Sequence, residues 1–194
     1  TSYLTGVRGN SDDNSVPDLT ARYTHRGDWG HFGVAGLVRQ LKVANTLGSE
    51  DDTAFAVSVS GKWNAGRSDD LRYMLTYGDG IGRYLGLGLG PDAMTAADGS
   101  LEALEGIGGF VAWRHVFSPK LRGNVFWSAA KFDNNPALTG LNVTESAQSF
   151  HANLIYSPLP KLDVGAELIW GNRELESGAD GDLRRLHMHV KYSF

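Results

Sequence analysis

The strongest constraint on the fold is the alternation of apolar and polar side chains in the last ten residues, RLHMHVKYSF (185–194). Leu186 and Met188 fall on one parity, whereas His187 and His189 fall on the other. Successive side chains of a β-strand point to opposite faces, so this segment is predicted to be a strand with one apolar and one basic face.

The same period-two pattern recurs along the chain and predicts about ten strands. Most of these segments approach the length of about 9 to 11 residues with which a tilted strand crosses a bilayer. The pattern is ambiguous in 30–41 and 119–131, because Leu37 and Phe126 would fall on the polar face. The segments are 3–7, 19–24, 32–39, 54–63, 71–77, 110–117, 121–128, 149–156, 162–170 and 185–194.

Short and long connections are expected to alternate between these strands. The short ones are 26–30, 66–70, 117–121 and 157–161, and the long ones are 10–18, 43–52, 78–106, 133–146 and 176–182. This asymmetry is typical of an outer-membrane barrel, which has short periplasmic turns and longer outer loops. It predicts that the last strand runs inward, with Phe194 at the periplasmic interface.

Aromatic residues are predicted to form two belts where the strands meet the lipid headgroups. Those near the periplasmic ends are Trp63, Phe117, Tyr156, Tyr192 and Phe194, and those toward the outer ends are Tyr77, Trp127 and Trp170.

These patterns predict an all-β fold, a transmembrane antiparallel β-barrel of the bacterial outer membrane with about ten strands in this sequence. The mean hydropathy of -0.26 resembles that of a soluble protein, but barrel strands hide apolar residues at every second position. The absence of cysteine excludes disulfides and thiolate metal sites. A net charge of only -4 gives no indication of nucleic acid as a partner.

The polar face of the predicted strands carries more cations than acids. Its clearest acids are Asp70, Asp163 and Glu167. A basic lumen wall attracts anions, because low-dielectric walls focus its field; the alternative is an internally paired wall without selectivity. The predicted pore-lining cations are Arg22, Arg39, Lys62, Arg72, Arg114, Arg122, Arg173, Arg185 and Lys191.

The long connection 78–106 is rich in glycine and has an apolar edge, which suits either of two positions. It folds into the mouth as a constriction, with Arg83 and Tyr84 at the narrowest point, or it lies outside against a neighbouring subunit. The sequence leaves both open.

No metal site, cofactor or catalytic residue is predicted. His187 and His189 share a face but lack an evident third ligand. Ser149 and His151 also share a face, yet one strand is not expected to place a Ser–His–acid set in hydrogen-bond order. The alternatives to a porin are an outer-membrane barrel enzyme and a plugged adhesive or structural barrel.

Four long stretches resemble the C-terminal part of DcaP-like porins: 16–41, 69–87, GGFVAWRHVFSPKLRGN (108–124) and 151–194. The resemblance implies a passive channel for dicarboxylates and similar organic anions, a homotrimer, and a 16-stranded barrel lined by basic residues. Full members also carry N-terminal strands and a helical region. The chain is therefore expected to be a single barrel domain (1–194), as the C-terminal portion of a longer porin or a shortened relative that closes on ten strands.

The end of the chain resembles the C-terminal signal that the barrel-assembly machinery recognises in outer-membrane proteins. Tyr192 and Phe194 carry this resemblance. The expected partners are that machinery, outer-membrane lipid with lipopolysaccharide, further copies of the chain and small anionic solutes, and no nucleic acid is expected.

Overall fold

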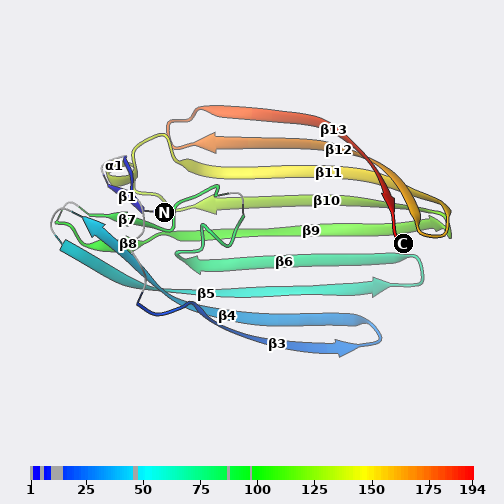
Figure 1. Cartoon of the computed structure of the whole chain (residues 1–194), viewed down its shortest axis with the longest axis horizontal. Coiled ribbons are helices and arrows are strands. Elements are labelled where there is room, and N and C mark those ends of the chain that lie inside the picture. Colours follow the sequence, from blue (N-terminus) through cyan, green and yellow to red (C-terminus); the bar gives the residue numbers. More distant parts are fainter. Residues whose placement is uncertain (1, 5–6, 10–14, 46–47, 87, 97) are drawn as a thin grey trace.

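A large antiparallel sheet of nine strands dominates the computed structural model, which describes residues 2–4, 7–9, 15–45, 48–86, 88–96 and 98–194 (Figure 1). The strand order is β13-β12-β11-β10-β9-β6-β5-β4-β3, so neighbours along the chain are neighbours in the sheet apart from the insertion between β6 and β9. The strands are β3 (Leu19–Gly27), β4 (Gly30–Asn45), β5 (Gly48–Ala65), β6 (Asp69–Asp79), β9 (Glu105–Ser118), β10 (Leu121–Phe132), β11 (Thr144–Leu159), β12 (Leu162–Leu175) and β13 (Asp180–Tyr192).

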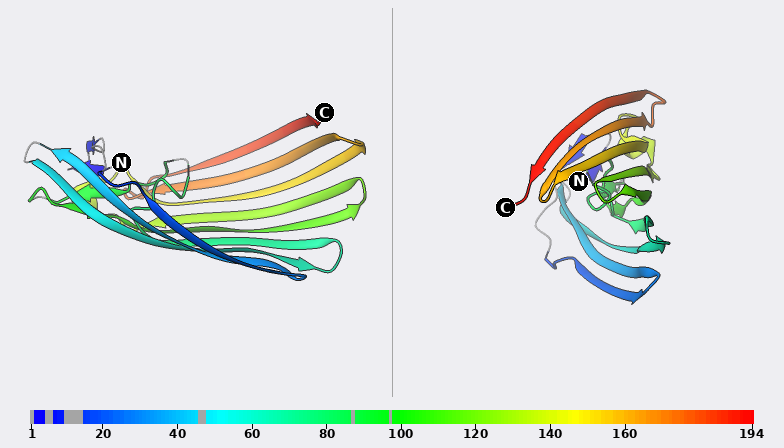
Figure 2. Two further views of the ribbon diagram at one scale, coloured as in Figure 1. Left: turned by 60° about the horizontal axis from the view of Figure 1, so that its bottom comes forward. Right: turned by 90° about the vertical axis from the view of Figure 1, so that its right-hand side faces the viewer.

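The sheet curves into a deep trough rather than lying flat (Figure 2). Among the described residues, its two edge strands, β3 and β13, do not pair with each other. The all-β antiparallel prediction is therefore confirmed, with nine strands in the sheet instead of about ten. Closure into a barrel and a total of sixteen strands stay predictions.

The predicted strand at 3–7 is wrong as a member of this sheet. Two short strands, β1 (Ser2–Leu4) and β2 (Val7–Gly9), instead join β7 (Ala93–Thr95) and β8 (Leu101–Ala103) in a separate sheet of order β2-β1-β7-β8. Each has three residues, too few to cross a bilayer. β1 pairs in parallel with β7, which belongs to the insertion between β6 and β9. The backbone of β1 therefore forms hydrogen bonds with this insertion and with β2, and not with the large sheet.

The connections differ between the two ends of the sheet, as expected, but less regularly than predicted. Two or three residues join the strands at the end where the C-terminus lies, whereas the long insertion and the β10–β11 connection lie at the opposite end (Figure 1). The latter contains the short helix α1 (Pro136–Thr139), whose N-cap is Asn135. None of the helices in the described part of the chain is long and apolar enough to cross a membrane.

Two predicted long loops are partly strand. In 43–52, β4 and β5 continue as a paired hairpin up to Asn45 and Gly48; residues 46–47 lie outside the described residues. Leu41 and Val43 extend the inward parity of β4 and are buried against Ala93 of the small sheet, so packing prolongs the strands. In 176–182 the connection closes in four residues between Leu175 and Asp180.

The two faces of the large sheet differ as the alternation predicts. The β6–β9 insertion lies on the concave side (Figure 2), where Leu85 packs over Gly108 of β9. Residues of the other parity therefore face outward, and they include exposed apolar side chains such as Val111 and Leu168. The ambiguous Leu37 and Phe126 do lie on the inner face, because they share the parity of the inner-wall residues.

The predicted aromatic belts follow this outward face. Trp63, Phe117 and Tyr156 are exposed near the ends of β5, β9 and β11 that carry the short turns. Tyr77 and Trp127 are exposed toward the opposite end. An apolar band between two rows of aromatic rings is the pattern of a lipid-facing surface.

Neighbouring residues of β12 test this assignment of faces. Leu168→Arg is expected to destabilise the protein by about 2 to 4 kcal/mol, because it places a guanidinium in hydrocarbon. Ile169→Arg, on the inner face beside Arg185, is expected to cost much less, because water solvates the new charge. Urea unfolding of both variants in lipid vesicles measures the difference, and equal costs would contradict the assignment.

Candidate functional site

The inner wall carries the candidate site, and the register shows which residues belong to it. Side chains directly opposite one another on adjacent strands share a face. Arg22 is joined in this way through successive strands to Gly108, over which the inward insertion packs. The same argument places every predicted cation on the inner face: Arg22, Arg39, Lys62, Arg72, Arg114, Arg122, Arg173, Arg185 and Lys191.

Three of these cations surround one buried carboxylate. Asp70, at the start of β6, is only 2% exposed. Its oxygens lie 2.7 Å from Arg72 Nε, 2.9 Å from Arg114 Nε and 3.9 Å from Lys62 Nζ. The three cations come from β5, β6 and β9, and each remains at least a third exposed. Because one negative charge faces three positive ones, this cation cluster carries a surplus of about two positive charges on the inner wall.

The other predicted cations are held differently. Arg122 Nη2 donates to Asp163 at 2.8 Å, so its charge is neutralised locally. Arg173 Nε donates to Thr144 Oγ1 at 2.8 Å, and Arg22 Nη2 donates to Ser60 Oγ at 3.2 Å; both bonds are to neutral groups. Arg185 and Lys191 are exposed on the edge strand β13.

The β6–β9 insertion lies inside the trough. Of the two positions that the sequence left open, the structure therefore shows the inward one. A side chain at Gly108 would meet Leu85 Cδ2 at 2.7 Å, and one at Gly90 would overlap the ring of Phe132. Small residues on both sides therefore permit the insertion to lie directly on the inner wall. Arg83 and Tyr84 lie within it, and their role as a constriction stays a prediction.

A group of charged residues fastens this insertion to the wall. Arg39 of β4 lies 3.0 Å from Asp92 and 3.5 Å from Asp18, and it also donates to the carbonyl oxygen of Gly80. Asp18 accepts hydrogen bonds from Arg83 and from the Tyr84 hydroxyl. We name Asp18, Arg39, Arg83, Tyr84 and Asp92 the loop latch.

The latch changes the interpretation of two predicted cations. Arg39 lies on the predicted face, but its side chain is 4% exposed and enclosed by the insertion, so it is not in a position to meet a solute. Arg83 keeps more than half of its side chain exposed. The Tyr84 hydroxyl and then the Asp18 carboxylate raise the pKa of Arg83, so it stays protonated.

Asp18 and Asp92 were missed as site residues by sequence reasoning. Asp18 has a usable signal, because it continues the inward parity of Thr20 and Arg22 by one step. Asp92 has none, since its position depends on how the insertion folds back onto β4.

A Ser–His–acid arrangement does occur on the wall, but it is formed across two strands. His151 Nε2 lies 3.1 Å from Ser149 Oγ, and its Nδ1 lies 3.5 Å from Glu167, which comes from β12 rather than from the same strand. The cross-strand pairing supplies the acid that one strand lacks. Ser149 Oγ also shares a hydrogen bond with Ser128, and Glu167 accepts one from Asn153. The set thus belongs to a continuous polar network of the wall.

No group of three or more His, Cys, Asp or Glu side chains suited to holding a metal ion occurs within the described ranges. His187 and His189 have ring centroids 6.3 Å apart on the exposed edge strand.

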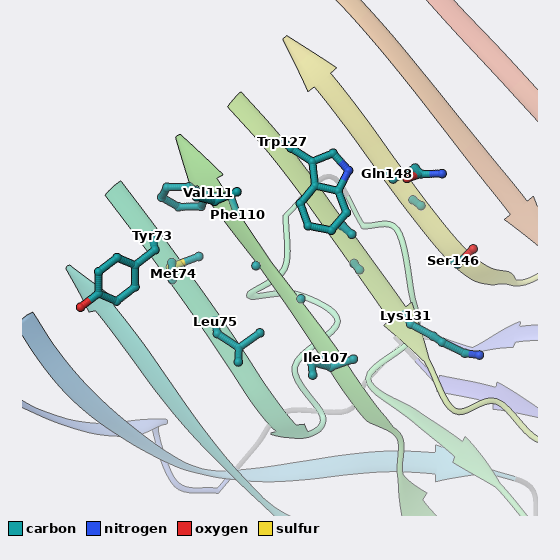
Figure 3. A pocket seen from close by; sticks show the side chains of 15 residues that line it. Tyr73, Met74, Leu75, Ile107, Phe110, Val111, Trp127, Lys131, Ser146 and Gln148 are labelled. Atoms are coloured by element: carbon teal, nitrogen blue, oxygen red, sulfur yellow. The ribbon is translucent and has the colours of Figure 1, made fainter. Parts of the chain in front are cut away.

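The outward face has an apolar hollow of about 590 Å³ across β6, β9, β10 and β11 (Figure 3). Leu75, Ile107 and Trp127 line it, and the small outward residues Gly109 and Ala129 leave the space between them. Lys131 lies at the edge of the hollow toward the long connections (Figure 3). The hollow belongs to the apolar outward surface and is separate from the inner wall.

Comparison with solved structures finds the outer membrane channel DcaP of Acinetobacter baumannii, with a TM-score of 0.83 and 25% sequence identity over 99% of this chain. This chain spans 56% of the length of that channel. A NanC porin matches 91% of this chain and 93% of its own length, at 9% identity and a TM-score of 0.47. No protein-family model and no curated protein sequence matches. The likeness to DcaP confirms the resemblance to DcaP-like porins and the location in the bacterial outer membrane.

Proposed function

We propose that this DcaP-like chain of the outer membrane forms part of the wall of a porin that lets small organic anions, such as dicarboxylates, diffuse passively. The concave face lines the water-filled path and the apolar convex face meets lipid. The fold shared with an outer membrane channel over 99% of the chain supports the porin. Solutes move down their gradient, and the wall sets which of them accumulate in the pore.

The observation that carries the proposed selectivity is the cation cluster around Asp70. Lys62, Arg72 and Arg114 exceed the charge of their shared carboxylate and stay partly exposed. A water-filled path with low-dielectric walls focuses such a field and raises the local concentration of anions. Arginine also binds carboxylates in a bidentate way, which favours organic acids over simple halides.

The inward insertion is proposed to narrow the path. It lies on the inner wall through Leu85 and the loop latch, and it presents Arg83 and Tyr84 on its exposed side. A cation at the narrowest point acts on every solute that passes, so this position adds to the preference for anions.

We further propose that residues 1–194 are the C-terminal portion of a longer barrel. The chain spans 56% of the DcaP channel, and within the part of the chain that the structure describes the sheet has two unpaired edges at β3 and β13. Open edges do not persist in hydrocarbon, where backbone groups find no water. By resemblance, homotrimer formation, contact with lipopolysaccharide, and assembly through Tyr192 and Phe194 belong to the same proposal.

The test is the reversal potential of the purified protein in a planar bilayer under a tenfold salt gradient. Anion-selective channels are the expected result. Cation-selective channels would keep the porin and contradict the role of the cluster. Folded protein without conductance would contradict the porin itself and favour a plugged adhesive barrel or a barrel enzyme.

A further inference from the structure

A cavity of about 510 Å³ lies between the inward insertion and the inner wall of β9 to β13. This inner cavity exists because the wall carries glycine and alanine at neighbouring inward positions. Gly108, Ala130 and Ala147 lie side by side on β9, β10 and β11. Gly171 of β12 lies one inward position further along, opposite Ser149. Small side chains there leave space that larger residues would fill.

One end of this cavity is apolar and aromatic. Phe110 and Phe126 form its floor with ring centroids 5.4 Å apart. Tyr84 and Leu85 of the insertion lie across from them. Phe110 and Phe126 are half-buried, and the apolar surface that they leave toward an aqueous path gains from contact with an apolar part of a solute. Tilted ring pairs accept a further ring at their faces and edges.

The other end is polar and cationic. Arg173 lines the cavity, and its bond to Thr144 uses Nε alone. Within the described residues its terminal nitrogens have no hydrogen-bond partner. Ser128 and Ser149 lie between this arginine and the aromatic floor, and their hydroxyls share one hydrogen bond of 2.8 Å. A carboxylate is the group that matches such a guanidinium.

We propose that this cavity is a binding subsite for aromatic monocarboxylates, with the ring on Phe110 and Phe126 and the carboxylate on Arg173. Phe126 lies opposite Ile169 of β12 through His151, so Arg173 is two strand spacings across the sheet and four residues along it from Phe126, about 16 Å between their Cα atoms. The arginine side chain and the aromatic ring each cover part of this distance, and an elongated solute with a ring at one end and a carboxylate at the other covers the rest. The choice of a small anionic solute as the ligand rests on the proposed porin function. Binding at this site can nevertheless be measured without any conduction.

The experiment compares 3-phenylpropanoate with propanoate by isothermal titration calorimetry on the detergent-solubilised protein. The two acids carry the same charge and differ by the ring. Phenylpropanoate is expected to bind about tenfold more tightly, because only it buries a ring against the aromatic floor. Arg173→Gln is expected to weaken both acids, whereas Phe126→Ala is expected to remove the tenfold preference.

A second variant covers the case in which loss of Phe126 disturbs the wall. A side-chain carbon at Gly171 would meet its nearest neighbours at 3.6 Å or more, so Gly171→Leu is tolerated by the backbone and fills the cavity. Gly36→Leu is the matched control, since Gly36 is exposed on the outward face and has nothing within 4 Å. Gly171→Leu is expected to remove the preference and Gly36→Leu to keep it.

Equal affinity of the two acids for the unmodified protein, or a preference that survives both Phe126→Ala and Gly171→Leu, would overturn the subsite. Neither result bears on conduction. Anion-selective channels without a preference for the aromatic acid would leave the porin intact, whereas a preference in protein that does not conduct would leave the subsite intact.

Discussion

A decrease of about threefold in anion selectivity is the expected result of replacing Arg72 and Arg114 by glutamine together with Asp70→Asn. The triple variant removes two cations and one anion, so the cluster changes from a surplus of about two positive charges to the single charge of Lys62. A unit charge acts on an ion about 6 Å away in water with about 0.7 kcal/mol. Each lost unit therefore lowers the preference for anions about threefold.

Asp70→Asn is included because Asp70 is buried. Removing its arginine partners alone would leave a buried carboxylate poorly compensated, at a cost of about 3 to 5 kcal/mol. Reversal potentials in planar bilayers measure the effect. Arg67→Gln is the control, since Arg67 lies exposed in the short β5–β6 turn. An unchanged reversal potential in the triple variant would show that other charges set the selectivity.

The sequence predicts the large sheet well because the alternation of side chains is a local property. An apolar residue at every second position fixes the outward face of each strand, and register then carries the assignment across the sheet. This is why the inward positions of Arg72 and Arg114 follow from the alternation alone. The same rule places Leu37 and Phe126 inward, and the ring of Phe126 fits a polar wall because it forms part of the floor of a cavity there.

Features that depend on packing between distant segments could not be predicted. The β4–β5 hairpin extends through 43–52 because Leu41 and Val43 pack against Ala93 of the insertion. The polar residues of this segment give no indication of that packing. Likewise, 3–7 has the alternation of a barrel strand, and the pairing of β1 with β7 leaves no local signal. The acid beside His151 is Glu167 on the next strand, and the spacing of residues along one strand does not reveal such a contact.

The loop latch is the clearest case of a long-range feature, and it yields the second large prediction. Arg39 joins Asp18 and Asp92, which lie on either side of it in the sequence and far away. Arg39→Gln removes the positive charge from this buried site, so the carboxylates of Asp18 and Asp92 lose the Arg39 guanidinium between them. The closed position of the insertion is destabilised by about 3 to 5 kcal/mol. The insertion is therefore expected to leave the inner wall more often, and the path is expected to widen.

Two measurements detect the movement of the insertion away from the wall in the Arg39→Gln variant. Single-channel conductance is expected to rise, and trypsin is expected to cleave after Arg83 about tenfold faster or more, because proteolysis tracks local opening. Arg22→Gln is the matched control: it removes an inner-wall arginine that hydrogen-bonds Ser60 and lies outside the latch. Unchanged conductance and protection in Arg39→Gln would show that the apolar contacts of Leu85 hold the insertion without the latch, since those contacts remain when the charge is lost.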